Sequence, residues 1–170
     1  MKALIFSDSH GNSRYMKKII KMSLDAQYVF FLGDGTSEID ELAELFPEKI
    51  FYAVKGNNDW SHSFFSQYKE ELVIELSGKR IFLTHGHNYR VKGGEQSLYY
   101  RALALRADVV LFGHTHIPCE RYVGENEIMY MFNPGSIGIP DVRGNYSFGC
   151  MSIKDGQILL SHGSVKNDGY

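Results

Sequence analysis

Five short polar motifs in this 170-residue chain contain the residue types that bind divalent metal ions, and each motif comes after an apolar run. In chain order they are Asp8-Ser9-His10, Gly33-Asp34, Gly56-Asn57-Asn58-Asp59, Thr84-His85-Gly86-His87 and Gly113-His114-Thr115-His116. Together they offer two carboxylates, one amide and at least four imidazoles as ligands. One such motif would mean little, but five in this order predict a hydrolytic centre with two metal ions.

The spacing within two of the motifs favours chelation. Asp8 and His10 stand two residues apart at the end of an apolar run, and in extended backbone such side chains point to the same side. On a helix they would diverge by about 200°. We therefore expect Asp8 and His10 to bind one ion while Ser9 faces away, and we expect the same geometry for His114 and His116.

The ligand types select a class of metal. No cysteine is among them, so the set fits Mn²⁺, Fe, Co²⁺, Ni²⁺ or Zn²⁺ rather than a thiolate zinc site or an iron–sulfur cluster. Two such ions outweigh the charges of Asp8 and Asp34 and would attract a phosphate anion. A pair about 3.5–4 Å apart would lower the pKa of a bridging water and clamp phosphate oxygens. Gly33, Gly56 and Gly113, which precede ligands, suit tight turns beside an ion.

The composition limits the class of protein and its partners. With 44% hydrophobic and 22% charged residues, the chain suits one globular domain. The net charge of −2 favours neither a nucleic-acid backbone nor an acidic membrane as a partner. The apolar stretch after Met1 is too short for a signal peptide, and no run reaches the length of a membrane span. Cys119 and Cys150 lack any disulfide or metal spacing, so a cytoplasmic protein with reduced thiols is expected.

The first third of the chain alternates between apolar runs and helical periodicity. Three buried strands and two helices are expected in the order 3–6, 13–26, 28–32, 37–46 and 50–54. Leu24 completes the apolar face of the first helix, and Ser37 could cap the second. This order predicts a parallel sheet with right-handed crossovers.

The remainder of the chain changes character. A helix is expected over residues 95–106, with strands at 71–76, 80–84, 108–112, 119–123, 128–132, 146–153 and 157–161. After the strand at 108–112 the pattern is typical of antiparallel hairpins. The sequence therefore predicts one α/β domain over residues 1–163, with a mixed core of two sheets, and a polar tail at 164–170.

The motifs, together with Asn133-Pro134-Gly135-Ser136, resemble those of the calcineurin-like metallophosphoesterases, and the length is similar to the small YfcE-type phosphodiesterases of bacteria and archaea. The resemblance covers nearly the whole chain. It implies a four-layer αββα sandwich of two mixed β-sheets, with the metals at the strand ends and the Asn-Pro-Gly-Ser loop at the edge of the site. By motif, the first metal would be held by Asp8, His10, Asp34 and His116, with Asp34 as the bridge, and the second completed by Asn57, His85 and His114.

One departure from the family concerns the proton donor. Many members have a histidine directly after the ligand asparagine, and the small phosphodiesterases often have a cysteine, whereas this chain has Asn58. An amide can bond a phosphate oxygen but cannot act as a general acid. His87 is the nearest alternative donor, although it could equally be a packing residue, and His62 is more typical of a loop histidine. Asp59 could orient Asn57 or anchor the loop.

The resemblance favours a metal-dependent phosphodiesterase that acts on a small phosphate ester, with Mn²⁺ as the leading metal. A phosphomonoesterase or nuclease is a second reading, although the missing histidine and the absence of a basic groove disfavour cyclic-nucleotide and nucleic-acid substrates. A third reading is a catalytically silent, metal-binding scaffold that resembles the retromer subunit of the same fold. Silent relatives would be expected to have lost ligands, and all seven expected positions are filled here. A homo-oligomer is possible, and the sequence does not decide the oligomeric state.

Overall fold

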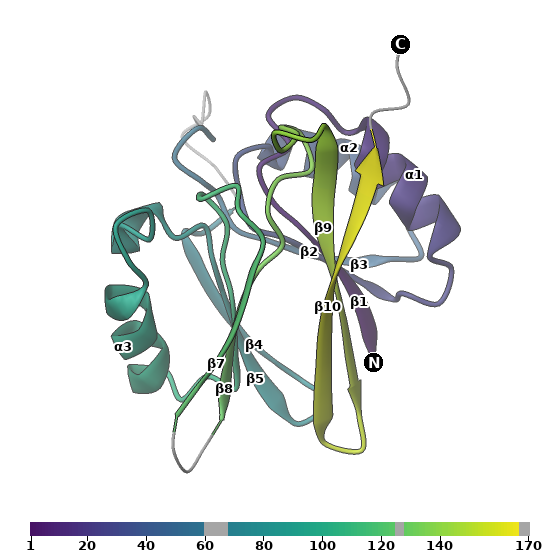
Figure 1. Cartoon of the computed structure of the whole chain (residues 1–170). Helices are drawn as coiled ribbons and strands as arrows, with labels where there is room; N and C mark the ends of the chain where they lie inside the picture. Colours follow the sequence, from purple (N-terminus) through teal and green to yellow (C-terminus); the bar gives the residue numbers. More distant parts are fainter. Residues whose placement is uncertain (60–67, 125–127, 167–170) are drawn as a thin grey trace.

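Two β-sheets and three α-helices make up the parts of the chain that the structure, a computed structural model, describes: residues 1–59, 68–124 and 128–166 (Figure 1). The strands are β1 (Lys2–Phe6), β2 (Tyr28–Phe31), β3 (Ile50–Ala53), β4 (Glu71–Leu76), β5 (Lys79–Thr84), β6 (Val109–Leu111), β7 (Cys119–Val123), β8 (Met129–Asn133), β9 (Asn145–Lys154) and β10 (Gln157–Lys166). The helices are α1 (Arg14–Met22), α2 (Thr36–Leu45) and α3 (Gln96–Ala104), with a 3-10 helix η1 (His87–Tyr89).

Each sheet has five strands that run in mixed directions. Sheet A has the order β10-β9-β1-β2-β3, in which β1, β2 and β3 are parallel and β9 is antiparallel to β1. Sheet B has the order β4-β5-β6-β8-β7, in which β5, β6 and β8 are parallel between antiparallel β4 and β7. Figure 1 shows α1 and α2 outside sheet A and α3 outside sheet B. The expected αββα sandwich of two mixed sheets is confirmed.

Three apolar layers hold the sandwich together, and the strands contribute alternate residues to neighbouring layers. Leu4 and Phe6 of β1 pack with α1 and α2, whereas Ala3 and Ile5 pack in the layer between the two sheets. In sheet B, Phe82 of β5 packs with residues of α3 in the third layer. A strand that is buried on both faces must be apolar throughout. The continuous apolar runs of the sequence are therefore the central strands.

The carboxyl ends of the central strands of both sheets meet at one edge. The loop after β1 is joined to the loop after β2, because Asp8 N donates to Gly33 O at 2.9 Å. The loop after β6 is joined to the end of β5, because Gly113 N donates to His85 O at 3.1 Å. Loops at this edge of parallel strands are the usual place for a binding site in α/β folds.

The region after β6 is less antiparallel than expected. β7 and β8 form the expected hairpin, but β8 lies between β6 and β7 and runs parallel to β6. The hairpin docks on the sheet through its second strand, which returns in the direction of β6. A local sequence pattern identifies a hairpin but does not say which of its strands meets the sheet.

Two expected boundaries differ by four residues or more, the ends of α1 and β10. The first helix ends at Met22 instead of Ala26, and Leu24 is 84% exposed instead of completing an apolar face. β10 continues to Lys166, into the segment expected to be a polar tail. Every residue of β10 pairs with β9, up to Lys166 opposite Asn145. Backbone pairing therefore extends the strand, and Val165 packs against the apolar layer that contains α1 and α2.

Candidate metal centre

The five motifs meet where β1, β2, β3, β5 and β6 end, and the structure brings all seven predicted ligands to this place. A first group consists of Asp8, His10 and His116, whose ligand atoms all lie within 4.8 Å of one another. Nε2 of His116 is 3.1 Å from Asp8 Oδ1 and 3.4 Å from Nε2 of His10. Three potential ligand atoms therefore converge on one point.

A second group consists of Asp8, Asp34 and His85, and it is completely buried. His85 Nε2 lies 3.5 Å from Asp34 Oδ2 and 3.9 Å from Asp8 Oδ1. The same nitrogen is 3.1 Å from Asn57 Oδ1 and 3.2 Å from His114 Nδ1. The two groups share Asp8, and Asp34 Oδ2 also lies 3.9 Å from Nε2 of His10, so both carboxylates stand between the groups.

The donor atoms are arranged as a metal site requires. His85 Nδ1 is 2.7 Å from Leu32 O, and because a carbonyl only accepts, this nitrogen carries the hydrogen and Nε2 presents its lone pair. Asp8 Oδ2 accepts from Ser7 Oγ at 2.5 Å and from His114 N at 3.1 Å. Its buried Oδ1 receives no hydrogen bond from the described residues. A cation would satisfy this oxygen, so the residues fit two divalent ions.

The charges of the site affect its titration. Burial acts to raise the pKa of Asp8, but His116 and His85 outweigh burial and lower it. The contact with Asp8 raises the pKa of His116, so a proton and a metal compete for that imidazole. Burial and the neighbouring His85 lower the pKa of His114 to about 4. His114 is therefore neutral at pH 7, as a ligand must be.

Five of the seven predicted ligands have left-handed backbone conformations. The φ angles are 56° at Asp8, 46° at His10, 60° at Asp34, 67° at His114 and 61° at His116. The expectation of extended backbone within the two Xaa-x-His pairs is therefore wrong. The shared-ion geometry expected for His114 and His116 is also wrong, because they face different groups. Such conformations cost roughly 1–3 kcal/mol each, so tertiary contacts must hold them.

Close backbone approach explains the glycines better than turn conformation does. Only Gly33 among the three has a positive φ, 99°. A Cβ on Gly56 would lie 2.1 Å from Asp34 Oδ1, and a Cβ on Gly113 would lie 2.0 Å from Ser7 Oγ. These two glycines give room to the buried carboxylates and to the groups that bind them.

The segment after β3 organises Asp34 through Asn58 and Asp59. Asn58 donates twice to the Asp34 carboxylate, from its backbone N at 2.8 Å and from Nδ2 at 2.6 Å. The Asp59 carboxylate accepts from the backbone amides of Asp34, Gly35 and Gly56 at 2.7 Å each and of Thr36 at 2.8 Å. Burial acts to raise the pKa of Asp59, but these amides outweigh it and lower the pKa.

Asp59 therefore anchors the loop, one of the two roles considered from the sequence. Asp59 also caps α2, a role that the sequence suggested for Ser37. The helix begins at Thr36, and its N-cap residue Gly35 has no side chain that could cap it. Both carboxylate oxygens are occupied by backbone amides, so the side chain positions ligands and is not free to exchange a proton with a substrate.

His87 lies beside the second group. Its ring centroid is 5.4 Å from that of His85 and 6.1 Å from that of His114. Its buried Nδ1 has no hydrogen-bond partner among the described residues. Burial and His85 lower the pKa of His87. The role of His87 as a proton donor therefore stays a prediction. His62 lies outside the described residues.

The Asn-Pro-Gly-Ser segment braces two ligand loops at once, as the resemblance implied. Asn133 Nδ2 donates to Gly113 O at 2.8 Å and to Thr115 Oγ1 at 3.0 Å. Ser136 Oγ donates to Asp8 O at 2.9 Å. The segment thus contacts the residues on both sides of His114 and the carbonyl oxygen of Asp8.

Two supporting residues were missed from the sequence. Buried Glu38 accepts at Oε1 from Ser9 Oγ at 2.8 Å and from Gly11 N at 2.7 Å, so it ties α2 to the loop that carries Asp8 and His10. Ser9 faces away from the metal centre, as expected. The sequence feature that could have identified Glu38 is an acidic residue in the first turn of α2.

His162 bonds Asn133 O at 2.7 Å and stacks on Phe132. The sequence feature that could have identified it is its place on the same side of the strand as buried Leu160.

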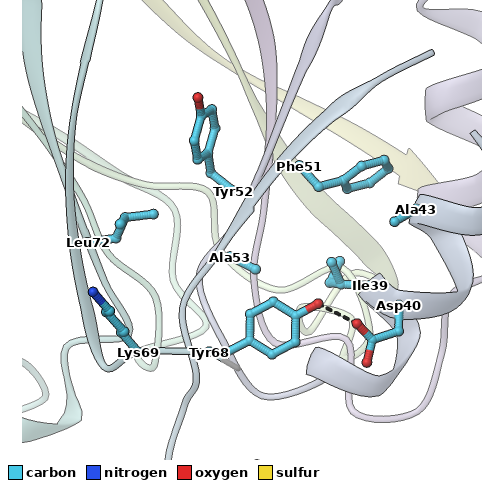
Figure 2. Close-up of a pocket in the computed structure, with 9 residues that line it drawn as sticks. All are labelled: Ile39, Asp40, Ala43, Phe51, Tyr52, Ala53, Tyr68, Lys69 and Leu72. Atoms are coloured by element: carbon cyan, nitrogen blue, oxygen red, sulfur yellow. Dashed lines mark hydrogen bonds between the residues drawn. The ribbon is translucent and has the colours of Figure 1, made fainter. Parts of the chain in front are cut away.

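A separate pocket lies between α2, β3 and the residues before β4 (Figure 2). Its volume is about 410 Å³, and Ile39, Phe51 and Leu72 are among the apolar residues of its wall. The Tyr68 hydroxyl donates to Asp40 Oδ1 at 2.5 Å (Figure 2). None of the predicted ligands lines this pocket, so we do not assign it to the chemistry of the metal centre.

The anchoring role of Asp59 predicts a stability effect. Asp59→Asn replaces one acceptor oxygen by an NH₂ group that faces backbone N–H donors, and it should lower the free energy of unfolding by about 1–3 kcal/mol. Chemical denaturation of metal-free protein measures this. The exposed turn variant Asp155→Asn is the control and should unfold like the wild type.

The pH dependence of this difference follows from the lowered pKa of Asp59. A carboxyl whose pKa is lower in the folded state stabilises the fold fully above its unfolded pKa, about 3.9, and loses this effect as the pH falls through the folded value. The gap between wild type and Asp59→Asn should therefore shrink from pH 7 toward pH 3. A gap that stays constant would contradict the charged hydrogen bonds.

Comparison with known proteins agrees with this geometry. The calcineurin-like phosphoesterase superfamily domain matches residues 1–156. The chain is 34% identical over 155 residues to the probable metallophosphoesterase YsnB of Bacillus subtilis (strain 168), which covers 91% of this chain and 86% of that protein. It is 27% identical over 173 residues to phosphodiesterase YfcE of Escherichia coli (strain K12), covering 89% and 87%.

The fold agrees as well. The crystal structure of a conserved protein from Streptococcus pneumoniae TIGR4, described as a predicted phosphoesterase, is similar with a TM-score of 0.76 at 30% identity. The match covers 95% of this chain and 87% of that one. None of the helices in the described residues is long and apolar enough to cross a membrane. By sequence and by fold, the chain belongs to the calcineurin-like phosphoesterase superfamily.

Proposed function

We propose that this protein is a metal-dependent phosphodiesterase that hydrolyses a small phosphate diester, with Asp8, His10, Asp34, Asn57, His85, His114 and His116 as metal ligands. The observation that carries the proposal is the pair of ligand groups that share the buried Asp8 carboxylate. When bound, two divalent ions supply positive charge that activates a water and offsets the charge of the phosphate. Oxygen and nitrogen ligands without thiolate make Mn²⁺ the leading metal, with Ni, Fe, Co or Zn as alternatives.

The residues of the chain prepare the site for this chemistry. Asn58 and Asp59 hold Asp34 through backbone and side-chain bonds, and Leu32 fixes the tautomer of His85. Glu38 of α2 holds the loop between β1 and α1, which carries Asp8 and His10. The ligands are thus oriented before any ion binds, and little reorganisation is needed during the reaction.

Asn58 limits the range of substrates. Its Nδ2 already donates to Asp34, and an amide has no acidic proton to give to a leaving oxygen. An aryl leaving group departs without a proton, whereas an alkoxide needs one. We therefore assign the natural role of proton donor to His87 or to a water, and expect esters with good leaving groups to react fastest.

The alternatives are separable. A catalytically silent scaffold has no need of a complete, converging set of ligands, so the two ligand groups support the enzyme over the scaffold. Phosphomonoesterase and nuclease activities would use the same centre, and only substrate tests separate them. Cys119 and Cys150 are both free, which supports the expected cytoplasmic location as a proposal; the oligomeric state stays open.

Metal content tests the ligand set. The reconstituted protein should bind about two divalent ions per chain. Asp8→Ala and Asp34→Ala should each damage both sites, because both carboxylates stand between the groups, whereas His10→Ala should weaken mainly one. Elemental analysis and calorimetric titration give the stoichiometry. The exposed variant Asp25→Ala should bind like the wild type, and an Asp34→Ala protein that kept both ions would refute the shared role.

Catalysis tests the function itself. Hydrolysis of bis(4-nitrophenyl) phosphate should be stimulated by Mn²⁺ and abolished by a chelator, because the metal ions supply the charge that the reaction needs. Asp8→Ala should be inactive and Asp25→Ala fully active. Undiminished turnover in excess chelator, with metal loss verified, would rule out the mechanism, and no turnover by the fully loaded protein would favour the scaffold.

Leaving-group dependence tests the proton donor. Positioned acid catalysis contributes about 10²–10⁴-fold, so the wild type should favour aryl over alkyl diesters strongly. Asn58→His should narrow this gap by speeding the alkyl diester selectively. The measurement is kcat/KM for both diesters in wild type, Asn58→His and His87→Ala. If the wild type cleaves alkyl diesters well and His87→Ala loses only that ability, His87 is the acid and the emphasis on position 58 is wrong.

A further inference from the structure

A hollow lined by both polar and apolar side chains lies next to the first ligand group, with His116 in its wall. The hollow has a volume of about 240 Å³ and is formed mainly by the loop before β9, the start of β9 and the end of β10. His116 belongs to both the hollow and the first group. A phosphate held at the metal centre would therefore have this space beside it.

The polar groups of the hollow are arranged as hydrogen-bond acceptors. Asp141 Oδ1 accepts from the backbone amides of Arg143 and Asn145, each at 2.8 Å, which fixes the carboxylate. Its Oδ2 receives only Asn145 Nδ2, at 3.2 Å, from the described residues. The Asn145 amide nitrogen donates to the Asp141 carboxylate, and its carbonyl oxygen can accept a hydrogen bond from a ligand.

His162 adds another acceptor. Its Nε2 lies 2.7 Å from Asn133 O, and a carbonyl accepts only, so Nε2 carries the hydrogen and Nδ1 presents a lone pair. The ring is held by stacking on Phe132, with centroids 4.3 Å apart. Lysine and arginine are absent from the described residues that line the hollow. Apart from His116, which belongs to the first ligand group, these residues therefore offer one negative charge and several lone pairs.

We propose that this hollow, here termed the acceptor pocket, binds one ester substituent of the phosphate diester, and that this substituent carries hydroxyl or ammonium groups. The proposal rests on the proposed function, because the metal centre must hold the phosphate. Donor groups on the substituent match Asp141, Asn145 and His162. The charge of Asp141 repels a second phosphate, so the pocket selects diesters of small alcohols over nucleic acid.

Binding of phosphate monoesters to the Mn²⁺-loaded protein tests the pocket without turnover. Calorimetric titration compares propyl phosphate, glycerol 3-phosphate and 2-aminoethyl phosphate. The last two should bind about tenfold more tightly than propyl phosphate, because each donates hydrogen bonds that propyl phosphate lacks. Tighter binding of 2-aminoethyl phosphate identifies an ammonium, and tighter binding of glycerol 3-phosphate identifies a polyol.

Variants locate the effect. Ser164→Phe should fill the pocket and bring the three affinities within about twofold of one another. A difference this small is expected when the substituent makes no specific hydrogen bond. Ser161→Phe, the same change on the same strand but outside the pocket, should keep the wild-type preference. Asp141→Asn does not change β10 and removes the negative charge of the pocket. It should reduce the affinity for 2-aminoethyl phosphate more than the affinity for glycerol 3-phosphate.

The outcomes separate the pocket from the reaction. Equal affinity for the three monoesters in the wild type overturns the acceptor pocket, even if the protein hydrolyses diesters. A clear preference in a protein that cleaves no diester keeps the pocket and overturns the proposed function. If no monoester binds the metal-loaded protein, both the acceptor pocket and the proposed function are overturned. A preference that survives both Ser164→Phe and Asp141→Asn places the selection elsewhere and overturns the assignment.

Discussion

The burial of two carboxylates within a few ångströms of four imidazoles is the constraint on which the rest of the site depends. Asp8 is fully buried and Asp34 is 2% exposed, and buried anions are costly unless donors or cations surround them. The donors come from neighbouring strand ends: His114 N serves Asp8, and Asn58 serves Asp34. Each ligand loop thus stabilises the charge carried by another, and the loops depend on one another for their shape.

Much of the architecture was readable from the sequence because its central strands are buried on both faces. Runs such as residues 3–6 and 28–32 have no polar face, and only parallel strands covered on two sides are typically apolar throughout. The polar residues that follow these runs then had to lie at one edge of the sheets, which brought the candidate ligands together. The αββα layering itself came from the resemblance of the motifs to a known family.

What the sequence did not provide depends on contacts between distant segments. The left-handed backbone at Asp8 and His10 is held by tertiary bonds, such as Ser136 Oγ to Asp8 O and His10 N to Asp34 O, which no local pattern encodes. The placement of β8 beside β6 depends on pairing with a strand outside its own hairpin, and the extension of β10 depends on pairing with the whole length of β9. Glu38 and His162 act through a loop and a carbonyl outside their own elements. The proton donor also lies beyond sequence pattern, because Asn58 departs from the family where the role would be assigned.

The ligands come from both sheets: Asp8, Asp34 and Asn57 follow strands of sheet A, and His85 and His114 follow strands of sheet B. An ion bound between them is therefore a non-covalent cross-link between the two halves of the sandwich, closing a loop from Asp8 to His116. Such a link removes chain entropy from the unfolded state, and the removal grows with loop length. An ion that bound only the folded arrangement would add its binding energy to folding stability. Loss of metal would thus weaken the cohesion of the two sheets along with the chemistry.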